Sequence, residues 1–177
     1  RIFYCQVIEI KARTQIDLDG QNTLMETMDE QMTNTISVIR HHFDPNQAFL
    51  GDRFDREIKN IELRELLRFY INRASRYNLL TYADCQEYHH LLDTLDAGFK
   101  WQFDKKGIIF DLNGDFGIQT YKRATDLSFF VVGKRAIRRI LDPNSPLNSK
   151  RPSEEEDAFS KYFRLREGNP LFETPQS

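Results

Sequence analysis

Residues 4–11, YCQVIEIK, form the stretch from which the fold of the whole chain is inferred. Its apolar and β-branched residues predict a β-strand, which we place at residues 2–11. Side chains two positions apart lie on one face of a strand, so Glu9 and Lys11 are expected on the same face as Val7. A carboxylate and an amine therefore occupy the end of an otherwise apolar strand face.

The sequence after this strand predicts an α/β protein. Apolar positions at helical spacing predict helices at about 24–43 and 61–77, and a capping-box pattern at 81–84 begins a third helix. Residues 99–112 predict a β-hairpin with a lysine-glycine turn, and residues 126–132 predict a buried strand before a short basic helix. The expected fold class is α/β, with a mixed β-sheet flanked by helices.

Length and composition favour a single main domain. A chain of 177 residues with 40% hydrophobic content can bury one core. We assign the α/β domain to residues 1–142. Residues 143–177 begin with many proline, serine and asparagine residues, and they predict a linker, a short C-terminal helix and a tail. The chain starts directly with a strand and without methionine, so we expect it to be a fragment of a longer protein, with an incomplete domain.

Charge and cysteine content narrow the function classes. Lysine and arginine number 25 against 27 acidic residues, so the net charge of −2 requires no polyanionic partner, and any DNA affinity must be local. The sequence contains neither an apolar run of membrane-spanning length nor a secretory signal, so we expect a cytoplasmic protein without a membrane partner. Cys5 and Cys85 are too few for a disulfide framework.

Glu9 and Lys11 allow two interpretations. A carboxylate can hold a divalent metal such as Mg²⁺, while a neighbouring lysine orients the attacking water or stabilises charge on a phosphate. Alternatively, the strand leaves the core at Glu9, and the two charges form a solvated ion pair of little energetic value. The short motif alone favours the solvated pair, and a second acidic group close in space would favour the metal site.

The context of the motif resembles a known nuclease family. VIEIK, a polar loop and a helix carrying DEQMTNT are similar to the latter part of a PD-(D/E)XK nuclease core, over roughly the first forty residues. The resemblance implies that Glu9 is a metal ligand, Lys11 the catalytic lysine and Gln31 a supporting residue. It also implies a restriction-endonuclease-like sheet, and the family's earlier aspartate would lie before Arg1.

A longer pattern resembles a narrower group. VIEIK, QMTNTISVIRHHF, LRELLRFYINRASRY and KKGIIFDL are together similar to the C-terminal nuclease-like region of HerA/FtsK-type ATPases in bacterial DNA-defence systems, namely the phosphorothioation-dependent restriction proteins. This implies a Mg²⁺-dependent deoxyribonuclease or a nuclease-like DNA-binding module attached to a motor ATPase. Its partners would be DNA and the ATPase part or other subunits of the defence complex. The alternative is a non-catalytic interaction or regulatory domain of a larger ATPase.

A basic cluster follows the predicted strand at 126–132. Lys134, Arg135, Arg138 and Arg139 lie at or just after a predicted helix start, where they could contact DNA phosphates or form a solvated face. The segment is not a phosphate-binding P-loop. Ser128 stands where that motif needs glycine, and Arg135 stands where it needs serine or threonine.

Two other patterns carry weaker signals. Asp111, Asn113 and Asp115 alternate like a calcium loop, but Phe116 stands where that loop needs glycine, so a turn is expected. The histidines occur as adjacent pairs at 41–42 and 89–90, which is not the i, i+4 spacing of a helical zinc site. Structural or surface roles are expected for them.

Overall fold

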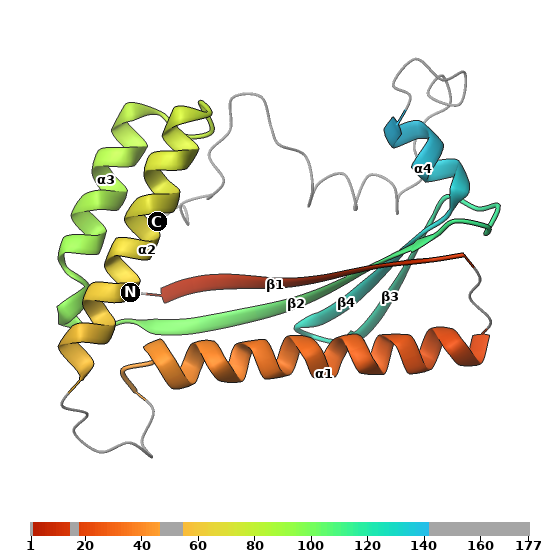
Figure 1. The fold of residues 1–177 in the computed structure, drawn as a ribbon, viewed down its shortest axis with the longest axis horizontal. Helices are drawn as coiled ribbons and strands as arrows, with labels where there is room; N and C mark the ends of the chain where they lie inside the picture. Colours follow the sequence, from red (N-terminus) through yellow and green to blue (C-terminus); the bar gives the residue numbers. More distant parts are fainter. Residues whose placement is uncertain (1, 15–17, 47–54, 142–177) are drawn as a thin grey trace. The chain divides into compact units, whose positions relative to one another are not determined.

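The computed structural model describes residues 2–14, 18–46 and 55–141 (Figure 1). Its elements in chain order are β1 (Ile2–Arg13), α1 (Leu18–Phe43), α2 (Arg56–Arg76), α3 (Tyr82–Asp93), the 3₁₀ helix η2 (Leu95–Ala97), β2 (Lys100–Asp111), β3 (Ile118–Ala124), β4 (Leu127–Val132) and α4 (Lys134–Leu141). The predicted α/β class, with a mixed sheet flanked by helices, is confirmed.

The described strands form one open sheet with the order β1-β2-β4-β3. β2 and β4 are parallel, whereas β3 and β4 are antiparallel neighbours. At the ends of β1 and β2, the amide of Leu112 donates a hydrogen bond to the carbonyl of Arg13 at 2.9 Å. β1 and β3 are therefore the edge strands, and this mixed, unclosed sheet is consistent with a nuclease-like α/β fold.

The described residues divide into two compact units. One contains residues 2–3, 39–46 and 55–101, and the other contains residues 4–14, 18–38 and 102–141. The domain predicted at 1–142 spans both units. The linker, helix and tail predicted at 143–177 lie outside the described residues.

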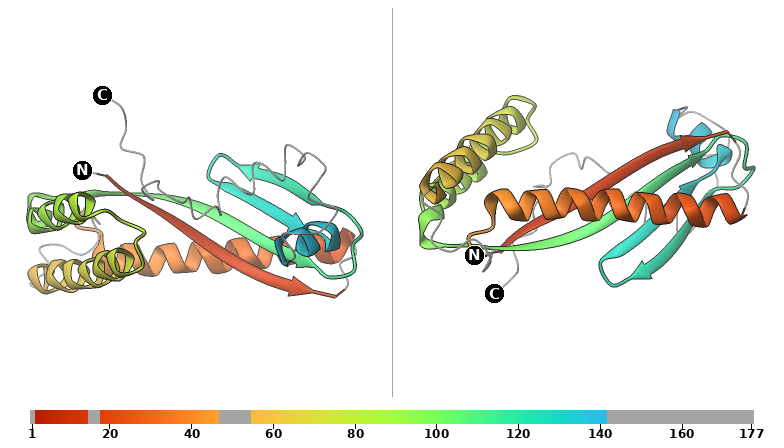
Figure 2. Two further views of the ribbon diagram at one scale, coloured as in Figure 1. Left: turned by 90° about the horizontal axis from the view of Figure 1, so that it is seen from above. Right: turned by 60° about the horizontal axis from the view of Figure 1, so that its bottom comes forward.

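In the second unit, α1 covers one face of the strands (Figure 2). Met25, Met28 and Met32 lie at helical spacing on its buried side, and each is at most 2% exposed. They pack in one cluster with Phe129 and Val131 of β4. The amphipathic stripe predicted from the sequence therefore forms one half of the core.

The opposite face of the same strands packs against α4. Phe130 and Val132 of β4 form a second buried cluster with Ala136 of α4. Adjacent residues of β4 thus alternate between the two helices, as the period of a strand requires. This is why residues 129–132, FFVV, are continuously apolar: this part of β4 is buried on both faces.

The hairpin predicted at residues 99–112 is wrong. Residues 100–111 form the single strand β2, and the hairpin of this region joins β3 to β4 through a turn at residues 125–126. Lys105 and Lys106 do not form a turn, because both lie within β2 with their side chains on opposite faces of the sheet. Lys105 bonds to Asp29 of α1, and Lys106 is only 7% exposed.

β3 was not expected because its sequence, IQTYKRA, is mostly polar. Its burial pattern explains this composition, since most of its side chains are exposed at the edge of the sheet. An edge strand needs few apolar residues when its neighbour supplies the core.

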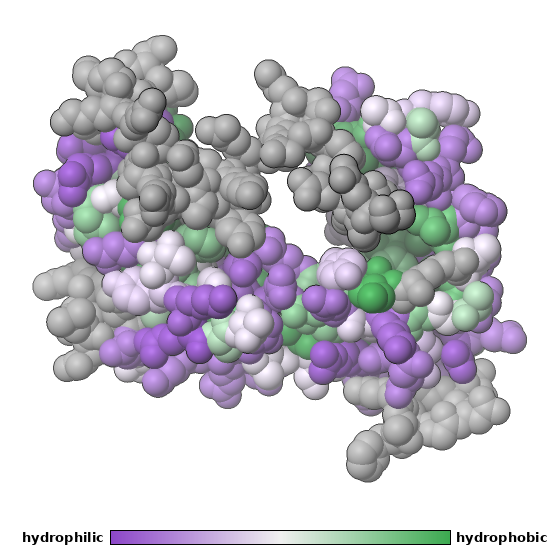
Figure 3. Space-filling model, turned by 180° about the vertical axis from the view of Figure 1, so that it is seen from behind, coloured by the Kyte–Doolittle hydropathy of each residue, from purple (hydrophilic) through white to green (hydrophobic). Residues whose placement is uncertain are grey.

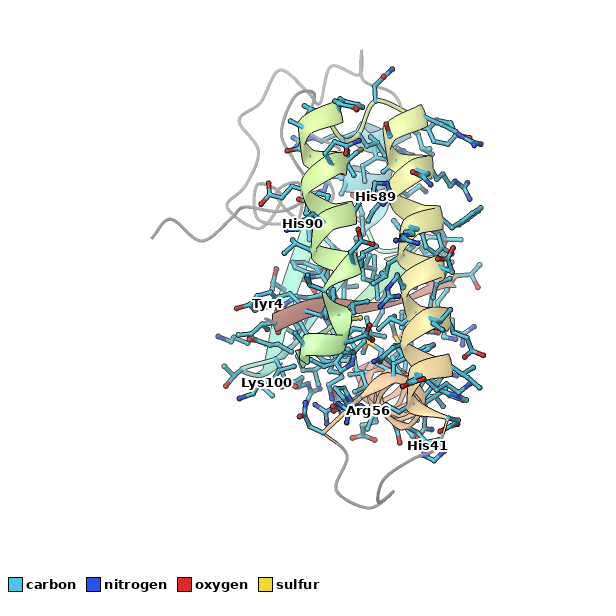
Figure 4. All side chains as sticks on the ribbon, turned by 90° about the vertical axis from the view of Figure 1, so that its left-hand side faces the viewer. Tyr4, His41, Arg56, His89, His90 and Lys100 are labelled. Carbon is cyan, nitrogen blue, oxygen red and sulfur yellow. The ribbon has the colours of Figure 1, made fainter. Side chains whose placement is uncertain are left out.

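In the first unit, α2 and α3 pack side by side (Figure 4). Leu63 of α2 and Leu92 of α3 share a buried cluster with Leu95 and Phe99. The predicted capping box of α3 is confirmed: Thr81 Oγ1 accepts from the amide of Asp84 at 3.2 Å, and the carboxylate of Asp84 accepts from the amide of Thr81 at 3.0 Å. 

Candidate functional site

Glu9 and Lys11 form an ion pair on β1. Lys11 Nζ lies 2.7 Å from Glu9 Oε1, and the two side chains are 28% and 29% exposed, Lys11 first. Exposure alternates along the strand, so the two charges share its less exposed face. The members of that face in the second unit are Cys5, Val7, Glu9 and Lys11. The shared face predicted from strand geometry is therefore observed.

The position of the pair follows from the packing of β1. Val7 packs against the cluster formed by α1 and the strands, so the face that carries Glu9 is the face toward α1. The opposite face is open: Ile8 and Ile10 are 40% and 56% exposed. The apolar stretch of β1 is thus half-buried, and the charged pair lies where this face leaves the core.

The residues present supply an incomplete set of metal ligands. Glu9 offers one carboxylate, which suits Mg²⁺, but a Mg²⁺ ion takes about six oxygen ligands. Among residues 2–14, 18–46 and 55–141, no three His, Cys, Asp or Glu side chains converge on a possible metal position. A metal bound at Glu9 would therefore need further ligands from water or from outside the described residues.

Gln31 does not join the pair within the described structure. It is exposed on α1, whereas Met28 and Met32 on either side of it are buried against the sheet. Its carbonyl accepts a hydrogen bond from Thr35 Oγ1 at 3.0 Å. Its supporting role beside Glu9 stays a prediction.

A polar group that the sequence did not indicate connects β2 to α1. Lys105 Nζ lies 2.5 Å from Asp29 Oδ1 and 3.2 Å from Thr33 Oγ1, and its side chain is 14% exposed. Thr33 also donates to Asp29 at 3.5 Å. The i, i+4 spacing of Asp29 and Thr33 is visible in the sequence, but the turn expected at residues 105–107 gives Lys105 no role beside them.

The predicted basic cluster lies on α4. Lys134, Arg135 and Arg138 are exposed, and Arg139 is half-buried. Arg135 is tied to the preceding loop, since its guanidinium donates to the carbonyl of Asp115 at 3.1 Å. Lys134 and Arg138 are thus exposed cations on the surface of the helix.

The N-terminus of α4 is capped by the loop before β3. The amide of Lys134 donates to the carbonyl of Gly114 at 2.8 Å, and that of Arg135 donates to the carbonyl of Phe116 at 3.1 Å. These amides are not open to an anion, so any phosphate contact would depend on side chains.

The same loop contains the turn expected in place of a calcium site. Asp111, which is 8% exposed, accepts hydrogen bonds from the amides of Asn113 and Gly114 at 3.1 and 2.9 Å. This arrangement is an Asx-type turn. Its function is to hold the loop whose carbonyls cap α4.

The surroundings of Cys5 and His89 in the structure are those of structural residues. Cys5 and Cys85 are free thiols, and burial raises the pKa of Cys5, which disfavours the reactive thiolate. His89 Nε2 lies 3.2 Å from Asn72 Oδ1 of α2, while His90 is exposed on another side of α3 (Figure 4).

On the face drawn in Figure 3, hydrophilic residues predominate and hydrophobic residues form small patches. Within the described part of the chain, every helix is too short or too polar to cross a membrane.

Comparisons with known proteins give no identification. No family model, no curated protein sequence and no solved structure matches this chain. The PD-(D/E)XK resemblance therefore rests on the residues quoted above and stays a prediction.

Proposed function

We propose that this chain is a nuclease-like module of a larger DNA-defence protein and that it contacts DNA at the Glu9–Lys11 end of β1. The observation that carries the proposal is the ion pair itself. A carboxylate and an amine lie 2.7 Å apart on one strand face, and both side chains are partly exposed. A phosphodiester could therefore reach both groups.

The proposed roles follow from the chemistry of the two side chains. Glu9 would supply one ligand of a Mg²⁺ site, and the ion would supply activation of water and neutralisation of negative charge. Lys11 would bind a non-bridging phosphate oxygen through its ammonium group. Because Glu9 is a single carboxylate, the remaining acidic ligands would come from the rest of the longer protein.

DNA binding is proposed to involve the exposed cations of α4. Lys134 and Arg138 would contact the phosphate backbone, which gives affinity without sequence specificity. The module would be linked to a motor ATPase, as the resemblance implies.

Calorimetric titration with Mn²⁺ and Mg²⁺ tests the metal site. We expect weak binding to the chain, and loss of that binding in Glu9→Gln. Glu26→Gln is the matched control, because Glu26 is an exposed glutamate on α1. Unchanged binding in Glu9→Gln, or no binding even in the full-length protein, would refute the metal role of Glu9.

A second candidate function is a non-catalytic interaction module. It is supported by the incomplete ligand set around Glu9 and by an exposed apolar face on α2. Cleavage of DNA by the full-length protein separates the two candidates. The nuclease proposal expects Glu9→Gln and Lys11→Met to abolish cleavage, whereas an interaction module expects wild-type cleavage in both variants.

A further inference from the structure

Helix α2 is apolar on two sides. One side packs inside its own unit, where Leu63 lies in the core and Leu67 and Ile71 pack against it. The other side is open to solvent and is called here the outer face of α2. Its large apolar residues, each 46–66% exposed, are Ile58, Leu66, Phe69, Tyr70 and Tyr77 just beyond the helix. Packing within the described structure explains why the inner side of α2 is apolar. The outer face has no partner among the described residues.

The charges on the outer face are arranged symmetrically about Phe69. Glu65 and Arg73 each lie four residues from it, and Glu62 and Arg76 each lie seven residues from it. Residues four and seven positions apart lie on one helix face, and all four charged side chains are exposed. The N-terminal half of the face, where Lys59 is paired with Glu62, is therefore acidic on balance, and the C-terminal half is basic.

We propose that the outer face of α2 binds the same face of a second copy of this chain, with the two helices antiparallel and crossing at Phe69. A two-fold axis through the crossing point makes such a contact self-complementary. Glu65 then lies opposite Arg73 of the partner subunit, and Glu62 lies opposite Arg76 of the partner subunit. A parallel pairing would place acid against acid, so the charge pattern selects the antiparallel one.

The present contacts of these charges do not compete strongly with the pairing. Glu62 is bonded to Lys59 at 2.7 Å and Glu65 to Arg68 at 2.9 Å, but the two carboxylate side chains are 50% and 62% exposed. Exposed ion pairs of this kind contribute little, about 0–1 kcal/mol, and can be exchanged.

The charged contact of Arg64, five residues before Phe69, lies on another side of the helix, where Arg64 donates to Asp96 at 2.8 Å. Asn72, three residues after Phe69, lies at the edge of the outer face, and its Oδ1 accepts a hydrogen bond from His89 Nε2 at 3.2 Å. The second copy would leave the Arg64 contact intact. Figure 4 shows side chains of α2 projecting away from α3 as well as toward it.

The balance of charge also favours a protein partner over a nucleic acid. Acidic and basic side chains both flank the apolar residues, whereas a DNA-binding face carries mainly basic ones. This inference does not depend on the nuclease proposal, because it uses neither Glu9 nor Lys11.

Sedimentation analysis of the whole 177-residue chain, from about 1 µM to several hundred µM, tests the pairing. We expect a monomer–dimer equilibrium. Phe69→Asp should weaken the dimer by about tenfold or more, because it buries a charge at the crossing point. Ile140→Asp, at an exposed apolar residue of α4, is the matched control and should leave the dimer unchanged.

Charge reversal tests the antiparallel register. Glu65→Arg and Arg73→Glu should each weaken the dimer, since each places like charges opposite one another, and the double variant should restore it. Circular dichroism checks that each variant is folded. A chain that stays monomeric at all concentrations, a dimer insensitive to Phe69→Asp, or a double variant that fails to restore pairing would overturn the proposal.

Discussion

Gly107 of β2 lies directly beside Phe129 of β4, its partner in the parallel register. A Cβ at Gly107 would lie 2.1 Å from Cδ1 of the Phe129 ring and 3.2 Å from Cε of Met28. Phe129 is 1% exposed and cannot move aside freely. Glycine therefore permits a close approach inside the core, and it does not make a turn.

We predict that Gly107→Ala destabilises the protein. The added methyl group must displace a buried ring, and overpacking of this kind costs about 1–3 kcal/mol. Urea unfolding followed by circular dichroism measures the change. Thr120→Ala, at an exposed position of β3, is the control and should have a much smaller effect. Equal stability of Gly107→Ala and the wild type would contradict the packing argument.

A second prediction concerns the contact of Lys105 with Asp29. Lys105 is mostly buried, so Asp29→Ala leaves its ammonium group without a carboxylate in a poorly solvated position. We expect a loss of about 1–3 kcal/mol of unfolding free energy. The double variant Asp29→Ala/Lys105→Met removes the stranded charge and should be more stable than Asp29→Ala alone. If the change in unfolding free energy of the double variant equalled the sum of the changes for Asp29→Ala and Lys105→Met alone, the two residues would not interact.

The elements that the sequence predicted correctly are those governed by local rules. The helical spacing of Met25, Met28 and Met32 needs no distant partner to be recognised, and the same is true of the capping box that begins α3. The shared face of Glu9 and Lys11 likewise follows from the period of a strand.

The errors came from interactions between distant segments. Lysine, lysine and glycine at 105–107 signal a turn locally, but Asp29 and Phe129 stabilise them within a strand. The sequence could suggest Glu9 as a ligand, but which other carboxylates approach it depends on the packing of segments far apart in the chain.

A third prediction concerns DNA contact by the exposed cations of α4. Lys134→Ala and Arg138→Ala should each weaken DNA binding and lower the slope of affinity against salt by about 1, because each removes one phosphate contact. Fluorescence anisotropy with a short duplex at several salt concentrations gives both quantities. Lys122→Ala, at an exposed lysine of β3, is the control. The same slope in the wild type and both α4 variants would exclude phosphate contacts by α4.

The final prediction concerns acid stability of the unit formed by α2 and α3. Hydrogen bonds from the hydroxyl and amide of Thr81 hold the pKa of Asp84 below its ordinary value of 3.8. Hydrogen bonds from Arg64 and Asn60 likewise lower the pKa of Asp96. Both folded pKa values are thus below the unfolded ones, so the two carboxylates stabilise the fold above pH 3.8, and this stabilisation is lost as the pH falls through the folded values.

Unfolding by urea at about pH 5 and about pH 3 measures this loss. The midpoint should fall with pH in the wild type, because protonation of the carboxylates removes their ionic hydrogen bonds. Asp84→Asn/Asp96→Asn should be less stable than the wild type at the higher pH and should lose less stability on acidification, because its amides do not titrate. If the double variant lost as much stability between the two pH values as the wild type, the acid sensitivity would have to come from other carboxylates.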